Sequence, residues 1–81
     1  MTIYVVEDAN ERLLAMFMAG QFAMDWCKKE IAGRMFPCEY HVYDYRMHGK
    51  QLTREGANLL FSIKASVSGK ITTDVNKITN V

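Results

Sequence analysis

Two histidines and an aspartate lie close together in the middle of the chain and are residue types that metal sites use. His41, Asp44 and His48 are three and four positions apart. Successive side chains of a strand point to opposite faces, so His41 and Asp44 are expected to diverge. This spacing does not bring ligands to one point, as a zinc site requires. We expect surface or partly buried histidines and no metal site.

Other residues that could act in catalysis have simpler explanations. Cys27 falls on the apolar side of an expected helix, where a thiol packs and does not react. Glu7, Asp8 and Glu11 cluster at a turn-forming segment, which a solvated turn explains better than acid–base chemistry. The sequence contains no glycine-rich phosphate-binding loop. We therefore predict that the protein is not an enzyme and needs no cofactor.

The clearest chemical signal is a stretch in which aromatic and basic side chains alternate. Its candidate binding residues are Tyr43, Tyr45, Arg46, His48, Lys50 and Arg54. If the tyrosine face is open, its chemistry resembles a stacking platform beside a basic loop, as single-stranded nucleic acids need. Tyrosines in strands more often belong to the core, which is the plainer interpretation.

Recognition of a protein is the competing interpretation within the binding class. Tyrosine and arginine often dominate protein interfaces. Four methionines add adaptable apolar surface, although methionines are also ordinary core residues; they are Met16, Met18, Met24 and Met47. A small sheet with one helix also leaves an edge or a face unprotected, so we expect copies of the chain to pair. The predicted partners are a protein, with RNA and a homo-oligomer as alternatives.

The composition is that of one globular domain over residues 1–81. Of the 81 residues, 49% are hydrophobic and 23% charged, which argues against a disordered chain. The formal net charge of +1 gives no nucleic-acid signal. Cys27 and Cys38 lack zinc spacing and are too few for a disulfide framework, so we expect reduced thiols in the cytoplasm. No signal peptide is evident, and no apolar stretch reaches the roughly 20 residues of a membrane span.

The element around which the chain is organised is a helix predicted over Gln21–Arg34. Its apolar side carries Phe22, Ala23, Trp26, Cys27 and Ile31, at spacings that match a 3.6-residue period. Gly33 and Pro37 follow as stop signals, whereas Glu30 projects into the apolar arc and does not fit. A helix of this length needs burial against a sheet, and we predict that Trp26 closes the core.

Strands are predicted before the helix. Thr2–Glu7 is rich in β-branched and aromatic residues and is followed by a turn. Two interpretations of Arg12–Gly20 remain open: a second strand over Arg12–Met18, paired with the first, or the beginning of one long helix. Gly20 favours the hairpin, because glycine is costly inside a helix but natural at a strand-to-helix junction. The leucines, alanine and methionines of this segment favour the helix.

After the helix, Glu39–Met47 alternates and predicts a strand whose inward face is ambiguous. One register places Tyr40 and Val42 inside. The other buries Tyr43 and Tyr45, hides more apolar surface and leaves the charged side chains in solvent.

The remaining segments complete an α+β fold. His48–Asn58 is predicted to be a loop, and the alternating Leu59–Val67 a half-buried strand with Val67 on its inward side. Ile71–Val81 is either a short helix or a frayed edge strand. The predicted order is β-β-α-β-β with a possible short C-terminal element. Its small antiparallel sheet of about four strands is covered on one face by the helix.

The chain as a whole has a general resemblance to the small accessory proteins of tailed bacteriophages. It begins with a strand-like MTIYVVED, has few cysteines and shows no catalytic signature. Such proteins take over the host or counter its defences, commonly by binding a toxin, nuclease or polymerase, sometimes with RNA. The resemblance implies a non-enzymatic inhibitor or regulator and assigns no site residue. The alternatives are a nucleic-acid-binding module that uses Tyr43, Tyr45 and the basic loop, and a structural homo-oligomerising domain.

Overall fold

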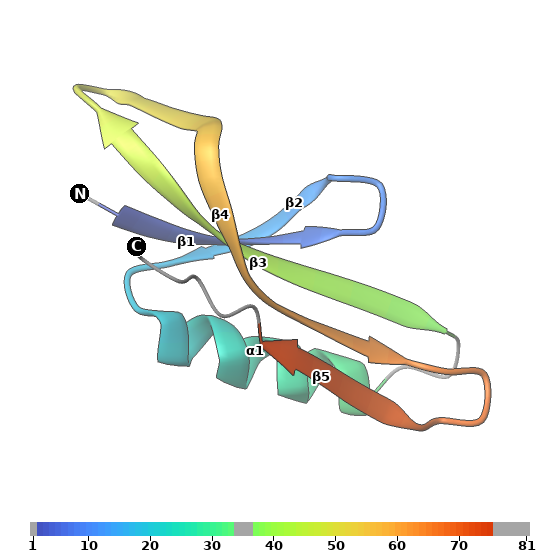
Figure 1. Ribbon diagram of the computed structural model, residues 1–81. Coiled ribbons are helices and arrows are strands. Elements are labelled where there is room, and N and C mark those ends of the chain that lie inside the picture. The colour runs from blue at the N-terminus through green and yellow to red at the C-terminus, as the bar shows by residue number, and fades with distance from the viewer. Residues whose placement is uncertain (1, 34–36, 76–81) are drawn as a thin grey trace.

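One antiparallel sheet with a helix across one face makes up the structure (Figure 1). The computed structural model describes residues 2–33 and 37–75. The elements are β1 (Thr2–Asp8), β2 (Leu13–Phe17), α1 (Gly20–Ala32), β3 (Cys38–His48), β4 (Gln51–Ala65) and β5 (Ile71–Val75). The five strands lie in the order β2-β1-β3-β4-β5, and all neighbours are antiparallel. The α+β class is confirmed, and the order becomes β-β-α-β-β-β.

The first hairpin confirms that the segment after the turn is a strand and not the start of a long helix. Oδ1 of Asp8 accepts hydrogen bonds from the backbone N–H groups of Asn10 (2.8 Å) and Arg12 (2.9 Å). The backbone N–H of Arg12 is the largest cause that lowers the pKa of the Asp8 carboxyl. Glu11 completes the loop with φ of 63°, the left-handed residue that three-residue hairpin loops require.

Helix α1 buries a narrower stripe than the sequence predicts. Its buried residues are Ala23, Cys27 and Ile31. Phe22 is 60% exposed, so its predicted burial is wrong. Residue 22 lies on the flank of this stripe, at the start of the helix and beside the groove described below. Arg34, the predicted end of the helix, lies outside the described residues, within which no helix is long and apolar enough to cross a membrane.

Trp26 is half-buried at the side of the core. Its ring meets that of Tyr40 edge-on, with centroids 5.7 Å apart, and that of Phe17 at a tilt, with centroids 6.3 Å apart. These contacts join α1 to the central strand β3 and to the outer strand β2, so Trp26 helps to close the core as predicted.

Strand β3 carries buried side chains on both faces, and this explains its ambiguous alternation. Tyr40 and Val42 belong to the core beneath α1, together with Val6, Phe61 and Ile63. Tyr45, on the opposite face, is only 7% exposed. The register that places Tyr40 and Val42 toward the helix is therefore correct, and the register that places the tyrosines 43 and 45 there is wrong.

The predicted loop His48–Asn58 is mostly strand. Gly49 and Lys50 form a two-residue turn, with His48 paired to Gln51, and β4 continues from there. Gly49 has φ of 62°, as such turns need at their first position. The hairpin projects beyond the rest of the sheet (Figure 1), so its residues have little core to face and lack the apolar alternation of a half-buried strand.

Strand β5 is an edge strand, so the helical alternative is wrong for residues 71–75, and residues 76–81 lie outside the described residues. All five of its residues are exposed. Val67 was predicted to face inward but is 85% exposed, because it lies in the turn that joins β4 to β5.

Two aromatic residues of α1 offer a matched test of this packing. Trp26→Ala should lower the free energy of unfolding by about 2–3 kcal/mol, somewhat less than for a fully buried tryptophan. Phe22→Ala removes a mostly exposed ring and should cost less than about 0.5 kcal/mol. Urea unfolding of both variants measures the difference. Equal losses would contradict the assigned roles of the two side chains.

Candidate functional site

The structure divides the six candidate binding residues between two regions. Tyr43, Tyr45 and Arg54 meet on the sheet face opposite α1. Tyr43 pairs with Val5 of β1, whose side chain points away from the face on which its neighbour Val6 packs in the core. Arg46 lies on the other face, at the base of the projecting hairpin, and His48 and Lys50 lie exposed at its tip. We name residues 46–53 of this hairpin the arm.

A buried carboxylate organises the first region. Glu7 is 1% exposed, and the Tyr45 hydroxyl donates a hydrogen bond to its Oε2. Nε of Arg54 donates to the same Oε2 at 3.1 Å, and Nη2 of Arg54 donates to Oε1 at 3.3 Å. Nη2 also reaches Oε1 of Glu11 at 3.4 Å. We call Glu7, Tyr45 and Arg54 the Glu7 cluster; sequence reasoning missed it, because its members come from three different strands.

Tyr45 and Arg54 both keep their protons at neutral pH. Burial, followed by the bond to Glu7, raises the pKa of Tyr45 to about 12. The bond to Glu7 is also the largest cause that raises the pKa of Arg54 above its ordinary value. At neutral pH a neutral phenol and a guanidinium cation therefore face the carboxylate, and its charge is compensated within the protein.

The same contacts limit stacking on the tyrosines. Cζ of Arg54 lies 4.9 Å from the centroid of the Tyr43 ring, so the guanidinium covers one face of that ring. Tyr45 is buried, with its hydroxyl turned to Glu7. The two rings therefore do not form a pair of open faces on which successive bases could stack.

The histidines and Asp44 do not converge. Nε2 of His41 lies 2.8 Å from Oε1 of Glu39, on the face opposite Asp44. The Asp44 carboxylate accepts hydrogen bonds from the backbone N–H of Asn58 at 2.5 Å and from its Nδ2 at 3.3 Å. Across residues 2–33 and 37–75, no group of three or more His, Cys, Asp and Glu side chains could hold a metal ion.

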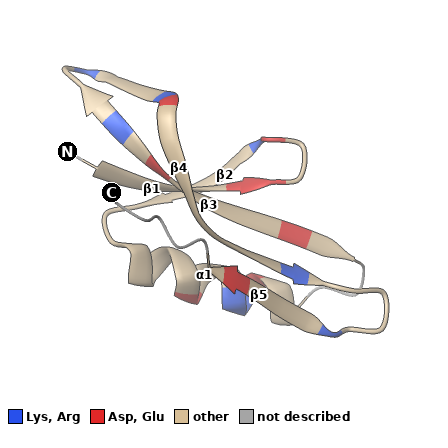
Figure 2. Ribbon diagram, viewed as in Figure 1, with Lys and Arg blue, Asp and Glu red and all other residues tan. Residues whose placement is uncertain are grey.

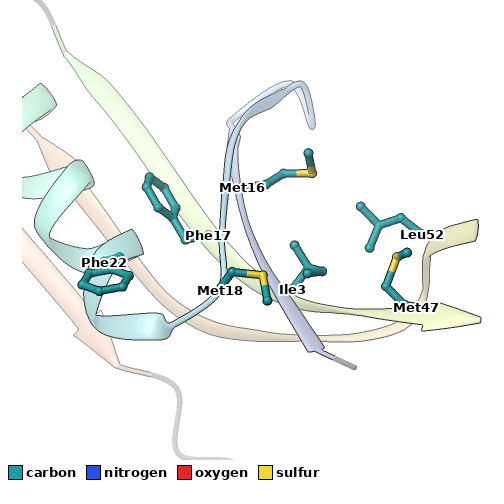
Figure 3. A pocket seen from close by; sticks show the side chains of 7 residues that line it. All are labelled: Ile3, Met16, Phe17, Met18, Phe22, Met47 and Leu52. Atoms are coloured by element: carbon teal, nitrogen blue, oxygen red, sulfur yellow. The ribbon is translucent and has the colours of Figure 1, made fainter. Parts of the chain in front are cut away.

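An apolar groove of about 590 Å³ opens between the arm and the first hairpin (Figure 3). Its lining residues are Ile3, Met16, Phe17, Met18, Phe22, Met47 and Leu52. Figure 3 shows Met47 and Leu52 from the arm at one end and Phe22 from α1 at the other. Three of the methionines singled out in the sequence meet here, whereas Met24 packs against the core. The groove draws on five elements, so the pattern of no single segment could reveal it.

Strand β2 borders the groove and lies at the edge of the sheet opposite β5. The large apolar side chains exposed on and just after it are Leu13, Leu14, Met16 and Met18. No charged residue occurs between Arg12 and Asp25. An outer strand with unpaired backbone groups and no charge is prone to pair with another chain.

The arm supplies positive charge beside the groove. Figure 2 shows basic residues along it, and no acidic residue occurs from Tyr45 to Arg54. The charge of Arg54 is taken up by Glu7 and Glu11. Arg46 and Lys50 make no ion pair with any described residue. The arm that borders the groove therefore carries two basic side chains, Arg46 on the face turned away from Met47 and Lys50 at the tip.

The hydrogen bond from Tyr45 can be tested with a matched pair of phenylalanine variants. Tyr45→Phe leaves the buried Glu7 carboxylate without one donor and should lower the free energy of unfolding by about 1–3 kcal/mol. Tyr43→Phe removes a hydroxyl that makes no hydrogen bond within the described part of the chain, and it should cost less than about 0.5 kcal/mol. Urea unfolding at neutral pH compares the two, and a cost in Tyr43→Phe as large as that in Tyr45→Phe would contradict the cluster.

The cluster also predicts a dependence on alkaline pH. Folding raises the pKa of Tyr45 from 10.0 to about 12, so its contribution to stability is complete below pH 10 and is lost as the pH rises toward 12. Burial likewise raises the pKa of the Cys27 thiol from 9.0 to about 11. Cys27 therefore adds a loss of stability between pH 9 and pH 11, and this loss is the same in both variants. Between pH 10 and pH 12 the free energy of unfolding should fall less steeply with pH in Tyr45→Phe than in Tyr43→Phe. Parallel curves would show that Tyr45 does not titrate as assigned.

Comparison with known proteins gives no further guide to this site. The chain matches no protein-family model, and neither the curated proteins nor the solved structures contain a significant match.

Proposed function

We propose that the protein is a non-enzymatic binding protein that inhibits or regulates a protein partner, which docks on the apolar groove. The observation that carries this proposal is the groove itself. Seven apolar residues line it, and it lies between an uncharged outer strand and a basic arm. The resemblance to accessory proteins of tailed bacteriophages supports a host toxin, nuclease or polymerase as the partner.

The exposure of the lining favours a protein as the occupant. Met16, Met18 and Phe22 are 54%, 66% and 60% exposed, which is a large apolar surface for a chain of 81 residues. Unbranched methionines can adjust to the shape of an incoming aromatic or aliphatic side chain. Such an anchor in an apolar pocket is what typically dominates the affinity of a protein interface.

The basic residues of the arm indicate which charge the partner should carry around that anchor. Arg46 and Lys50 of the arm make no ion pair with a described residue, so acidic groups on a partner that extends from the groove onto the arm would complement them. RNA would also satisfy these charges. It would find no stacking platform, however, because Arg54 covers Tyr43 and Tyr45 is buried.

The proposal is tested with two glutamate variants. Met16→Glu places a charge in the groove and should weaken capture of the partner from the native host's lysate at least about tenfold. Val67→Glu, in the exposed turn between β4 and β5, is the matched control and should bind as the unmodified protein does. Titration of the captured partner into both variants gives the affinities.

Three outcomes would overturn the proposal. Equal binding by Met16→Glu and Val67→Glu would remove the groove from the interface. Capture that disappears after nuclease treatment would assign the surface to RNA. Light scattering that shows the purified chain to self-associate, and Met16→Glu to be monomeric, would make a second copy the occupant.

A further inference from the structure

The pairing of β4 with β3 is interrupted where the arm joins the sheet. Positions 44 and 46 of β3 pair with positions 58 and 53 of β4. Tyr45 therefore faces a bulge of four residues, 54–57, in which the ladder is broken. Gly56 in this bulge has φ of 77°, a conformation that suits glycine. Figure 1 shows β4 bending sharply between the arm and the rest of the strand.

The arm has few attachments beyond this bulge. At its base Arg46 still pairs with Thr2 of β1, but among the described residues those beyond Arg46 pair only within the arm. The tip from residue 48 to residue 51 is exposed. The arm is thus joined to the sheet by β3 and by a bent part of β4 that does not pair with β3, which is the geometry of a hinge.

The two walls of the groove lie on opposite sides of this hinge. Met47 and Leu52 pair across the arm and form one wall. Ile3 and Met16, from β1 and β2, belong to the other. A change in the angle of the arm therefore changes the width of the groove.

Arg54 ties the two sides together. It is the first residue after the arm and lies in the bulge. Its guanidinium binds Glu7 of β1 and Glu11 of the first hairpin loop while resting on the Tyr43 ring. One side chain thus fastens the hinge to the hairpin that carries the opposite wall.

We propose that the arm is a hinged wall of the groove, with residues 54–57 as the hinge and the Arg54–Glu7 contact as a latch that sets the width of the groove. This inference rests on the proposed function of the groove as a docking site, and it assigns the control of that site. Release of the latch lets the arm swing outward and admits a bulkier anchor.

Spin labels on the two sides of the groove test the hinge in the free protein. One label is attached at Lys50→Cys in the arm and the other at Asn10→Cys in the first hairpin loop, in a background with Cys27→Ala and Cys38→Ser. Electron paramagnetic resonance then gives the distribution of distances between the labels. Arg54→Gln should broaden this distribution at least about twofold and shift it to longer distances. Arg46→Gln, which removes an arginine that makes no ion pair with a described residue, should leave it unchanged.

A second variant guards against a general loss of structure. Glu11→Gln weakens only the exposed part of the tie and should broaden the distribution by a smaller amount. A distribution that is the same in Arg54→Gln, Glu11→Gln and the unmodified chain would overturn the hinge. Because this measurement needs no partner, that failure would leave the docking proposal standing. Equal partner affinity of Arg54→Gln and the unmodified chain, in the presence of a broadened distribution, would overturn the control of the site by the arm.

Discussion

A carboxylate removed from water has to be compensated where it lies, and in this protein that requirement falls on Glu7. An unpaired charge at such a position would cost several kcal/mol, so its partners must be delivered to it. Tyr45 comes from the central strand and Arg54 from the bulge of β4. Much of the irregular geometry follows from this demand. The bulge brings Arg54 over the sheet, and the left-handed turn at Glu11 places a second carboxylate within its reach.

The sheet has two faces with different roles. The face toward α1 is closed by the helix and forms the core. On the other face, Tyr45 and Arg54 bind the Glu7 carboxylate, and the apolar groove opens between β2 and the arm. Arg46 and Lys50, which make no ion pair with a described residue, lie in the projecting hairpin. Of the basic candidates that alternate with aromatic rings in the sequence, Arg54 lies against the Tyr43 ring, whereas Arg46, His48 and Lys50 lie in the arm.

Local spacing was sufficient for the first hairpin and for the helix, because Gly20 and the apolar period of residues 22–31 carry that information within one segment. Local spacing was insufficient for Phe22, because the width of the stripe that a helix buries depends on the sheet beneath it and not on the sequence of the helix. The strand in the predicted loop was missed because an arm largely in solvent has no apolar period to detect. For the candidate site, the sequence indicated which residues are involved but not which of them contact one another. The partners of Tyr45 and Arg54 depend on Glu7, more than 35 residues away in the chain.

The pairing of β1 with β3 differs from every other contact in the sheet. It joins residues 32 to 44 positions apart, from Asp8 with Tyr40 to Thr2 with Arg46, whereas all other strand pairs are neighbours in sequence. Isolated hairpins form in roughly 1–10 μs, but bringing β1 to β3 closes a loop that contains β2 and the whole of α1. Glu7 loses its water in the same event, since Tyr45 belongs to β3. We therefore expect the pairing of β1 with β3 to limit the rate of folding, because the entropy of chain closure and the desolvation of a charge must be overcome together there.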